Sequence, residues 1–152
     1  MRYLTSIILL LFAWSASAQS NGSKETKASE ALHHYIHNGD NTFEWTVRDS
    51  LVGDNCTAYR LRMRSQTWRE KEWIHELVIF VPERITNNEA LIHISGGSAN
   101  EQTGEPNYHS WDDSLIGFMS GIATRCEALT AILWQVPRQP LFDGKYEDEL
   151  VS

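Results

Sequence analysis

The sequence is poor in cysteine, in basic residues and in long apolar runs, and each shortage narrows the class of protein. Two cysteines among 152 residues allow one disulfide at most. The chain has no visible basic cluster and has 20 acidic residues against 13 basic ones, so binding to a nucleic-acid backbone is not expected. The longest apolar run, residues 4–14, falls short of the roughly 20 residues that span a membrane.

Residues 1–18 have the organisation of a secretory signal peptide. Arg2 supplies the positive charge, residues 4–14 are apolar, and the small residues 16–18 form an A-x-A cleavage pattern. No cysteine follows directly, so a lipid anchor is not expected. We therefore predict an exported protein, periplasmic or secreted, without a membrane anchor after cleavage; an uncleaved anchor is the alternative.

The mature chain is expected to contain one domain, because its length is ordinary for a single domain. Arg2 is the only charged residue removed with the leader, so 12 basic and 20 acidic residues remain, a net charge of −8 with histidine neutral. Residues 19–29 are polar and small and predict a flexible lead. The domain is predicted over residues 30–152.

Export would place the two cysteines in an oxidising compartment, where a Cys56–Cys126 disulfide becomes possible. Nothing in the sequence brings their Cα atoms within the roughly 7 Å that a disulfide needs. The alternative is two free thiols, buried at Cys126 in a predicted helix and solvent-facing at Cys56 in a turn-like stretch.

The first predicted element is a short helix over residues 30–37, with apolar residues at helical spacing and Asn38-Gly39 as its end. His33 and His37 share one face, with Asp40 beyond, which is a possible metal-binding set. A polar face on a surface helix explains these histidines without a metal, because a fourth ligand is unaccounted for. We predict neither a metal nor a cofactor.

Two alternating stretches, residues 42–48 and 57–65, predict an antiparallel hairpin, and residues 75–81 predict a third strand. The dense charged and aromatic segment 66–73 between them is interpreted as a connection.

The basic and the aromatic side chains around this hairpin are interpreted separately. Arg60, Arg62 and Arg64 form a row that is expected on the solvated face of a strand. Trp68 and Trp73 either close the edge of the sheet or line a ligand cleft.

The second half of the chain has the pattern of a βαβ unit. Leu91–Ile94 and Leu129–Val136 are apolar runs, and the segment Ser110–Glu127 between them has apolar residues at helical intervals. Two parallel strands joined by a crossover helix follow from this pattern. The apolar run at 91–94 predicts a strand covered on both faces, with His93 as a satisfied buried histidine and not a catalytic one.

The order of elements predicts an α/β fold in which antiparallel strands lead into a parallel βαβ unit. After residue 136 the sequence supplies no second long helix. The sheet is therefore expected to be incomplete.

A family resemblance rests on several short motifs in a fixed order. They are Ser65-Gln66-Thr67-Trp68-Arg69, Trp73-Ile74-His75-Glu76-Leu77, Phe80-Val81-Pro82, Leu91 to Ser98, Val136-Pro137-Arg138-Gln139-Pro140-Leu141 and Glu147-Asp148. The chain resembles, from about Ala31 onward, the PhoPQ-activated pathogenicity-related protein family. The resemblance implies an exported protein with an α/β-hydrolase-like fold, of which this chain is the N-terminal part.

The active site that this resemblance implies is not complete in the sequence. An α/β-hydrolase nucleophile sits in a G-x-S-x-G elbow, followed along the chain by an acid and a histidine, and no such elbow occurs here. The loop after Leu91–Ile94 contains Gly96-Gly97-Ser98 and precedes the crossover helix, so it corresponds better to the loop that supplies backbone amides to an oxyanion hole. Gly97 and Ser98 are the candidate donors, and a plain strand-to-loop turn is the alternative.

Three functions are compatible with these features. The first is a truncated part of an α/β-hydrolase-like protein, inactive alone. The second is a self-contained exported module that binds a carbohydrate or a peptide at Trp68 and Trp73. The third, a metal-dependent enzyme that uses His33, His37 and Asp40, has the least support. The substrate cannot be deduced from the sequence.

Overall fold

The computed structural model describes residues 27–68, 70–136 and 145. It divides into two compact units, residues 1–38 and 39–152. The predicted signal peptide (1–18) and most of the flexible lead (19–29) lie outside the described residues and stay predictions. In the described part of the chain, no helix has the length and hydrophobicity required to cross a membrane.

The described part of the first unit contains one helix, α1 (Ala28–Ile36), close to the predicted range. Its apolar residues Leu32, Tyr35 and Ile36 follow helical spacing, and all three are exposed. The helix ends at His37, whose amide donates to the carbonyl of His33 at 3.1 Å.

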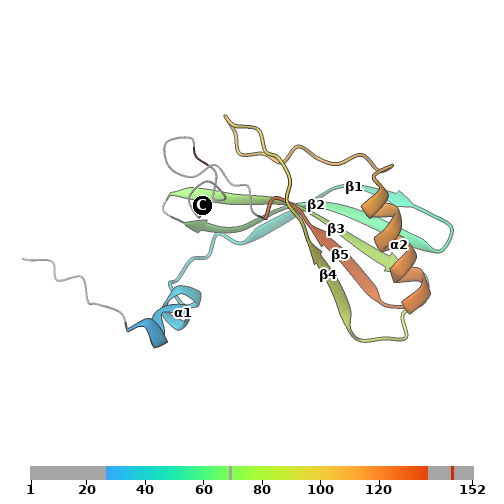
Figure 1. The fold of residues 1–152 in the computed structure, drawn as a ribbon, viewed down its shortest axis with the longest axis horizontal. Helices are drawn as coiled ribbons and strands as arrows, with labels where there is room; N and C mark the ends of the chain where they lie inside the picture. Colours follow the sequence, from blue (N-terminus) through green and yellow to red (C-terminus); the bar gives the residue numbers. More distant parts are fainter. Residues whose placement is uncertain (1–26, 69, 137–144, 146–152) are drawn as a thin grey trace, which may run out of the picture. The chain divides into compact units, whose positions relative to one another are not determined.

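The second unit is built on a five-stranded mixed sheet (Figure 1). The strands are β1 (Glu44–Val52), β2 (Cys56–Trp68), β3 (Lys71–Pro82), β4 (Ala90–Ile94) and β5 (Leu129–Leu133). Their spatial order is β1-β2-β3-β5-β4; all neighbours are antiparallel except β4 and β5, which are parallel and joined through α2 (Ser114–Cys126). The predicted α/β class, with antiparallel strands leading into a parallel βαβ unit, is confirmed.

The segment 66–73 is not the connection that we predicted from its composition. β2 and β3 stay paired through it, with Thr67 opposite Glu72 and Trp68 opposite Lys71. A register shift between Arg64 and Gln66 interrupts the alternation of side chains at that point. Such a bulge disturbs the period-two pattern on which strand prediction depends. The predicted strand therefore ended at residue 65, before the end of β2.

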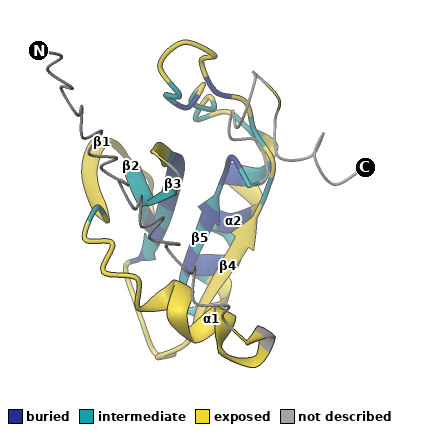
Figure 2. Ribbon diagram, turned by 90° about the vertical axis from the view of Figure 1, so that its left-hand side faces the viewer, coloured by how far each residue is buried: buried dark blue, intermediate teal, exposed yellow. Residues whose placement is uncertain are grey.

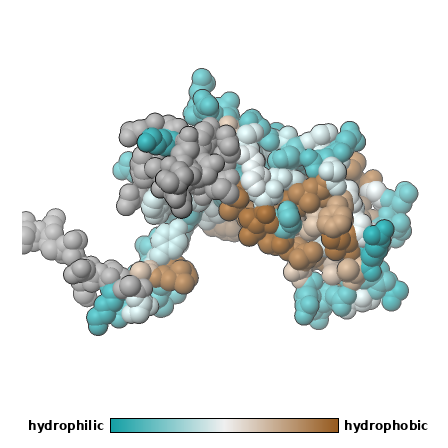
Figure 3. Space-filling model, viewed as in Figure 1, coloured by the Kyte–Doolittle hydropathy of each residue, from teal (hydrophilic) through white to brown (hydrophobic). Residues whose placement is uncertain are grey.

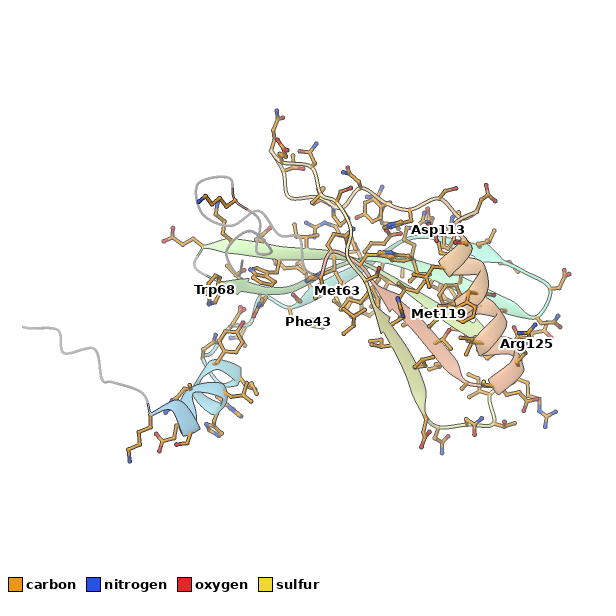
Figure 4. The ribbon with its side chains drawn as sticks, viewed as in Figure 1. Phe43, Met63, Trp68, Asp113, Met119 and Arg125 are labelled. Carbon is orange, nitrogen blue, oxygen red and sulfur yellow. The ribbon has the colours of Figure 1, made fainter. Side chains whose placement is uncertain are left out.

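Helix α2 begins four residues later than predicted, at a well-formed cap. The carboxylate of Asp113 accepts a hydrogen bond from the amide of Leu115 at 2.8 Å, and the helix ends before Glu127, which has a left-handed φ of 48°. Figure 4 shows Asp113 and Arg125 at the two ends of this helix. A Cβ on Gly117 would meet nothing within 4 Å, so no close packing requires a glycine at this position of the helix.

The hydrophobic core lies between α2 and one face of the sheet. The helix contributes Ile116, Met119 and Ala123, which are spaced along one side and 3% exposed or less. Phe80 of β3 and Ile132 of β5 are fully buried against them. This layer packs α2 on β2, β3 and β5.

Strand β4 is exposed along its whole length, so the prediction that it is covered on both faces is wrong (Figure 2). Leu91, Ile92 and Ile94 keep 49–55% of their surface accessible, and His93 is exposed where we expected it to be buried. An apolar run indicates a preference for burial but does not supply the layer that buries it. In residues 70–136 that layer is absent on one face of the sheet.

The two thiols have the opposite exposures to those predicted. Cys56 begins β2 and is 8% exposed, whereas Cys126 ends α2 and is exposed. Both are free thiols in this structure.

Asp40 provides a pH-dependent contact at the start of the sheet unit. Its carboxylate accepts hydrogen bonds from the hydroxyl of Thr42 at 2.6 Å and from the amides of Thr42 and Thr67 at 2.9 and 2.8 Å. These bonds, the Thr42 hydroxyl first, lower the pKa of Asp40 below its usual 3.8. A lowered folded-state pKa means that the stabilisation is complete above that usual value and is lost as the pH falls through the folded-state pKa.

We therefore expect Asp40→Asn to lower the urea midpoint of unfolding at pH 7. The midpoints of the variant and the parent should converge below about pH 4. A difference that stays constant down to pH 2.5 would show that the charge of Asp40 is not responsible.

Candidate functional site

The candidate site lies at the carboxyl ends of the parallel strands β4 and β5, the edge where open α/β sheets bind ligands. The chain segments that follow the two strands are joined by backbone hydrogen bonds. Ser95 donates to the carbonyl of Leu133 at 2.9 Å, and Val136 donates back to the carbonyl of Ser95 at 3.1 Å. The two loops therefore leave the sheet side by side.

Gln135 connects the elements at this edge. It is fully buried and has a φ of 61°, a left-handed conformation that is uncommon for a residue with a side chain. Its side-chain oxygen accepts from the amide of Glu76 at 2.8 Å, and its Nε2 donates to the carbonyl of Ser98 at 3.4 Å. Strained residues of this kind cluster at functional sites.

Gly97 has no side chain because Gln135 occupies the space. A Cβ at this position would lie 2.7 Å from Nε2 of Gln135 and 3.1 Å from its backbone nitrogen. A glycine lets another group approach the backbone closely, and at Gly97 that group is the side chain of Gln135. Gly96 has no such neighbour, since a Cβ there would meet nothing within 4 Å.

Ser98 begins a short hairpin-like loop. Its carbonyl accepts from the amide of Asn107 at 2.9 Å, and its hydroxyl accepts from the Asn107 side chain at 3.0 Å. An isolated bridge pairs Ala99 with Pro106 inside this loop. Among the described residues, no acceptor is present for the amides of Gly97 and Ser98. Their role as oxyanion-hole donors stays a prediction, and it needs N–H groups of this kind.

A buried ionic network anchors the far end of the same loop. Glu76 is fully buried in β3; its Oε2 accepts from Nδ1 of His109 at 2.8 Å and from the His109 amide at 3.0 Å. Nε of Arg60 donates to Oε1 of Glu76 at 2.9 Å. The ring of His109 stacks on Trp134, with centroids 4.3 Å apart. This histidine is thereby fixed in position beside the end of β5.

The prediction that the basic row of β2 lies on a solvated face is wrong for Arg60. It is 6% exposed, donates to the carbonyl of His109 at 2.7 Å and lies over the ring of Trp111 at 3.9 Å. Asp49 of β1 completes its partners at 3.2 Å. The alternation of β2 was interpreted correctly, but the arginine side of the strand faces the loop 98–113, which could not be placed from the sequence.

The other two arginines of the row are half-buried and paired. Arg62 binds the carboxylate of Glu105 at 2.7 Å, and this hydrogen bond raises the pKa of the guanidinium above its usual value. Arg64 is paired with Glu44 at 3.0 Å. Burial raises the pKa of the nearby Tyr108 phenol. The loop is therefore held to β2 by the Arg62–Glu105 pair and by the bond from Arg60 to the carbonyl of His109, whereas Arg64 pairs with β1.

The other candidate residues make ring contacts with one another. The rings of His33 and His37 stack on each other inside the first unit, with centroids 4.2 Å apart. No cluster of three or more metal-ligating side chains occurs among the described residues. Trp68 and Trp73 pack edge to face, with centroids 6.3 Å apart, at the hairpin end of β2 and β3.

Glu76, His109 and Gln135 were not identified from the sequence as members of a site. One signal for Glu76 was available, because a carboxylate within a strand of Ile74, Leu77 and other apolar residues needs a buried partner. Its partners lie 16 to 59 residues away along the chain, so the sequence could not show which they are.

The two glycines of the loop give a matched test of its packing. We expect Gly97→Ala to destabilise the protein by about 1–3 kcal/mol, because the new methyl group overlaps the fixed side chain of Gln135. Gly96→Ala is the control and should have little effect, since the space around it is open. Equal urea unfolding curves for the two variants would contradict the contact with Gln135.

The sequence is similar to those of a known protein family and of a curated protein. The model of the PhoPQ-activated pathogenicity-related protein family matches residues 32–152. The autocrine proliferation repressor protein A of Dictyostelium discoideum is 29% identical over 156 residues, an alignment that covers 96% of this chain and 28% of that protein. The chain thus spans less than a third of the length of this curated relative. No solved structure matches the chain.

Proposed function

Because this chain belongs to the PhoPQ-activated pathogenicity-related protein family, we propose that it is the N-terminal part of an exported α/β-hydrolase-like protein. In this proposal the chain contributes one wall of an active site and is inactive alone. The nucleophile, acid and base come from the rest of the longer protein.

The observation that carries the proposal is the unfinished sheet. Parallel sheets are covered by helices on both faces, yet within residues 70–136 the one helix is α2, which packs on one face. In the described sheet, β4 has a neighbour on one side only. The relative in Dictyostelium discoideum is more than three times as long as the matched segment, which leaves ample chain to complete such a sheet.

The loop 95–98 is the part of the active site that the chain would supply. It follows β4 directly and is held by Gln135 and Asn107. Two successive amides, of Gly97 and Ser98, could donate to an oxyanion at this edge. The 152 residues contain no G-x-S-x-G elbow, so the group that would attack a substrate is not among them. This is the reason for expecting no hydrolysis by the chain alone.

Export rests on the leader pattern of residues 1–18 and on the family resemblance. Fusing these 18 residues to a reporter enzyme that is active only outside the cytoplasm tests this part separately. Reporter activity outside the cytoplasm would support export. Ala16→Leu and Ala18→Leu remove the small-residue cleavage pattern, so they should leave an active but longer fusion that keeps residues 1–18.

The main test compares this chain with the protein encoded by the source DNA when translation continues past the codon for Ser152. We expect an open frame that reaches a G-x-S-x-G elbow, and a protein that hydrolyses simple p-nitrophenyl esters. The 152-residue chain should show no hydrolysis above buffer. A stop codon at that point, together with cooperative unfolding of the purified chain, would overturn the proposal.

A further inference from the structure

Among the described residues, one face of the sheet is apolar, and much of it is exposed, although Leu61 near its centre is only 5% exposed. A hollow of 390 Å³ on this face is lined entirely by hydrophobic and aromatic side chains: Phe43, Trp45, Val47, Tyr59, Leu61, Met63, Leu77 and Ile79. Trp45 and Val47 of β1 keep 56% and 53% of their surface accessible. Figure 4 labels Phe43 and Met63 at the β1–β2 part of the face, and Figure 3 shows hydrophobic side chains gathered on the sheet unit. We call this surface the apolar face.

The apolar face continues across the sheet to its other edge. Ile79 of β3 is paired with Ala131 of β5, which is paired with Ile92 of β4, so these side chains point to the same side. Ile94, two residues further along β4, shares this orientation. Ile92 and Ile94 are each 55% exposed. The surface therefore extends from β1 to β4, opposite the face that α2 covers.

An apolar surface of this extent is not an ordinary solvent-facing face. Antiparallel sheets with one solvated side show polar residues on that side, whereas here the arginines of β2 lie on the other face, where Arg60 and Arg62 bind the loop 98–113. Contiguous apolar patches beyond a few hundred Å² mark interaction sites in soluble proteins. Each Å² removed from water contributes roughly 25 cal/mol, so covering this face would stabilise the fold substantially.

We propose that the apolar face is the docking surface for the remainder of the same, longer polypeptide. That polypeptide presents the apolar side of an amphipathic helix to the hollow. This inference rests on the proposed function, because it needs chain beyond the 152 residues, and it adds where that chain binds and with which chemistry.

Two observations select this occupant over a second copy of the chain. β4 and β5 are parallel, and parallel strands are connected by crossovers that place helices of the same polypeptide on both faces. The relative in Dictyostelium discoideum has 72% of its length outside the matched region, enough for several such crossovers. A second copy would cover the face with another strand surface and leave the parallel unit without its second helix layer.

Cysteine labelling can locate the occupant. Val47→Cys places a thiol on the apolar face, and Thr46→Cys places one on the opposite side of the same strand, where the parent residue is also exposed. Both are made in a Cys126→Ser background, because Cys126 is exposed and would react. Labelling with a maleimide is then compared between the 152-residue chain and the protein translated past residue 152.

We expect the thiol at 47 to react readily in the 152-residue chain and about tenfold or more slowly in the longer protein, because labelling then requires local opening of a packed layer. The thiol at 46 should react at similar rates in both. Circular dichroism confirms that each variant is folded. A thiol at 47 that is equally reactive in a longer protein that hydrolyses esters would overturn the docking surface and leave the proposed function intact.

A second outcome would show that the proposed occupant is wrong. Protection of the thiol at 47 in the 152-residue chain, lost on dilution together with a dimer seen by analytical ultracentrifugation, would show that a second copy covers the face. A stop codon after Ser152 overturns the proposed function, and with it this occupant. Protection confined to the longer protein and independent of concentration supports the docking surface.

Discussion

Replacing Glu76 by leucine should cost about 3–5 kcal/mol of folding free energy, because the buried guanidinium of Arg60 loses its fully buried carboxylate partner and keeps the half-exposed Asp49. It also removes the acceptor of two hydrogen bonds from His109. For a domain with a total stability of about 5–15 kcal/mol, a loss of this size should shift the urea midpoint strongly.

The double variant Arg60→Leu/Glu76→Leu tests the reason for this loss. Removing both charges should cost less than the sum of the two single changes, because neither charge is then buried alone. The two single variants also test the contacts of the loop. Arg60→Leu removes the donor to the carbonyl of His109, and Glu76→Leu removes the acceptor of the His109 ring. Strictly additive losses in the double variant would show that the two residues do not act through each other.

Replacing Phe80 by alanine should lower the free energy of unfolding by about 3–5 kcal/mol. The ring is fully buried between β3 and α2, and its removal leaves a cavity in the core. Phe118→Ala is the matched control. Phe118 lies on α2 but is 63% exposed, and alanine is the better helix former, so its loss should have little effect.

Phe80→Leu keeps this prediction measurable if the alanine variant does not fold. The smaller cavity should lower the loss below that of alanine while leaving it larger than that of Phe118→Ala. Urea unfolding followed by tryptophan fluorescence gives all three values. Equal stabilities for Phe80→Leu and Phe118→Ala would contradict the position of the core under α2.

The fold was predictable where its signals are local. The alternation around Trp45 and Tyr59 identified the hairpin, and apolar runs on either side of a helical pattern identified the parallel unit. The prediction was wrong where a bulge near Ser65 interrupts the alternation and where it assumed that an apolar strand has cover. The sequence of one strand does not say which layers are present around it.

The candidate site was predictable only in part, for a related physical reason. The Gly-Gly loop after Ile94 was identified from the sequence as part of the candidate site, and the structure places Gly97 against the side chain of Gln135. The residue that approaches, Gln135, and the ion network of Arg60 and Glu76 depend on partners brought together by the sheet. A charge on a strand predicts that a partner exists but does not give its position in the chain.

The strand order also sets the sequence in which the protein can assemble. β1, β2 and β3 follow one another along the chain and pair with their neighbours, so they can form as the chain emerges from the ribosome. β4 has only β5 as a partner in the described sheet, and β5 is made after α2. Residues 90–94 are therefore apolar and without a strand partner in the described sheet until residues 129–133 have been synthesised. The fourth strand to be synthesised is the fifth to join, and this interval is when a nascent chain is most exposed to mispairing.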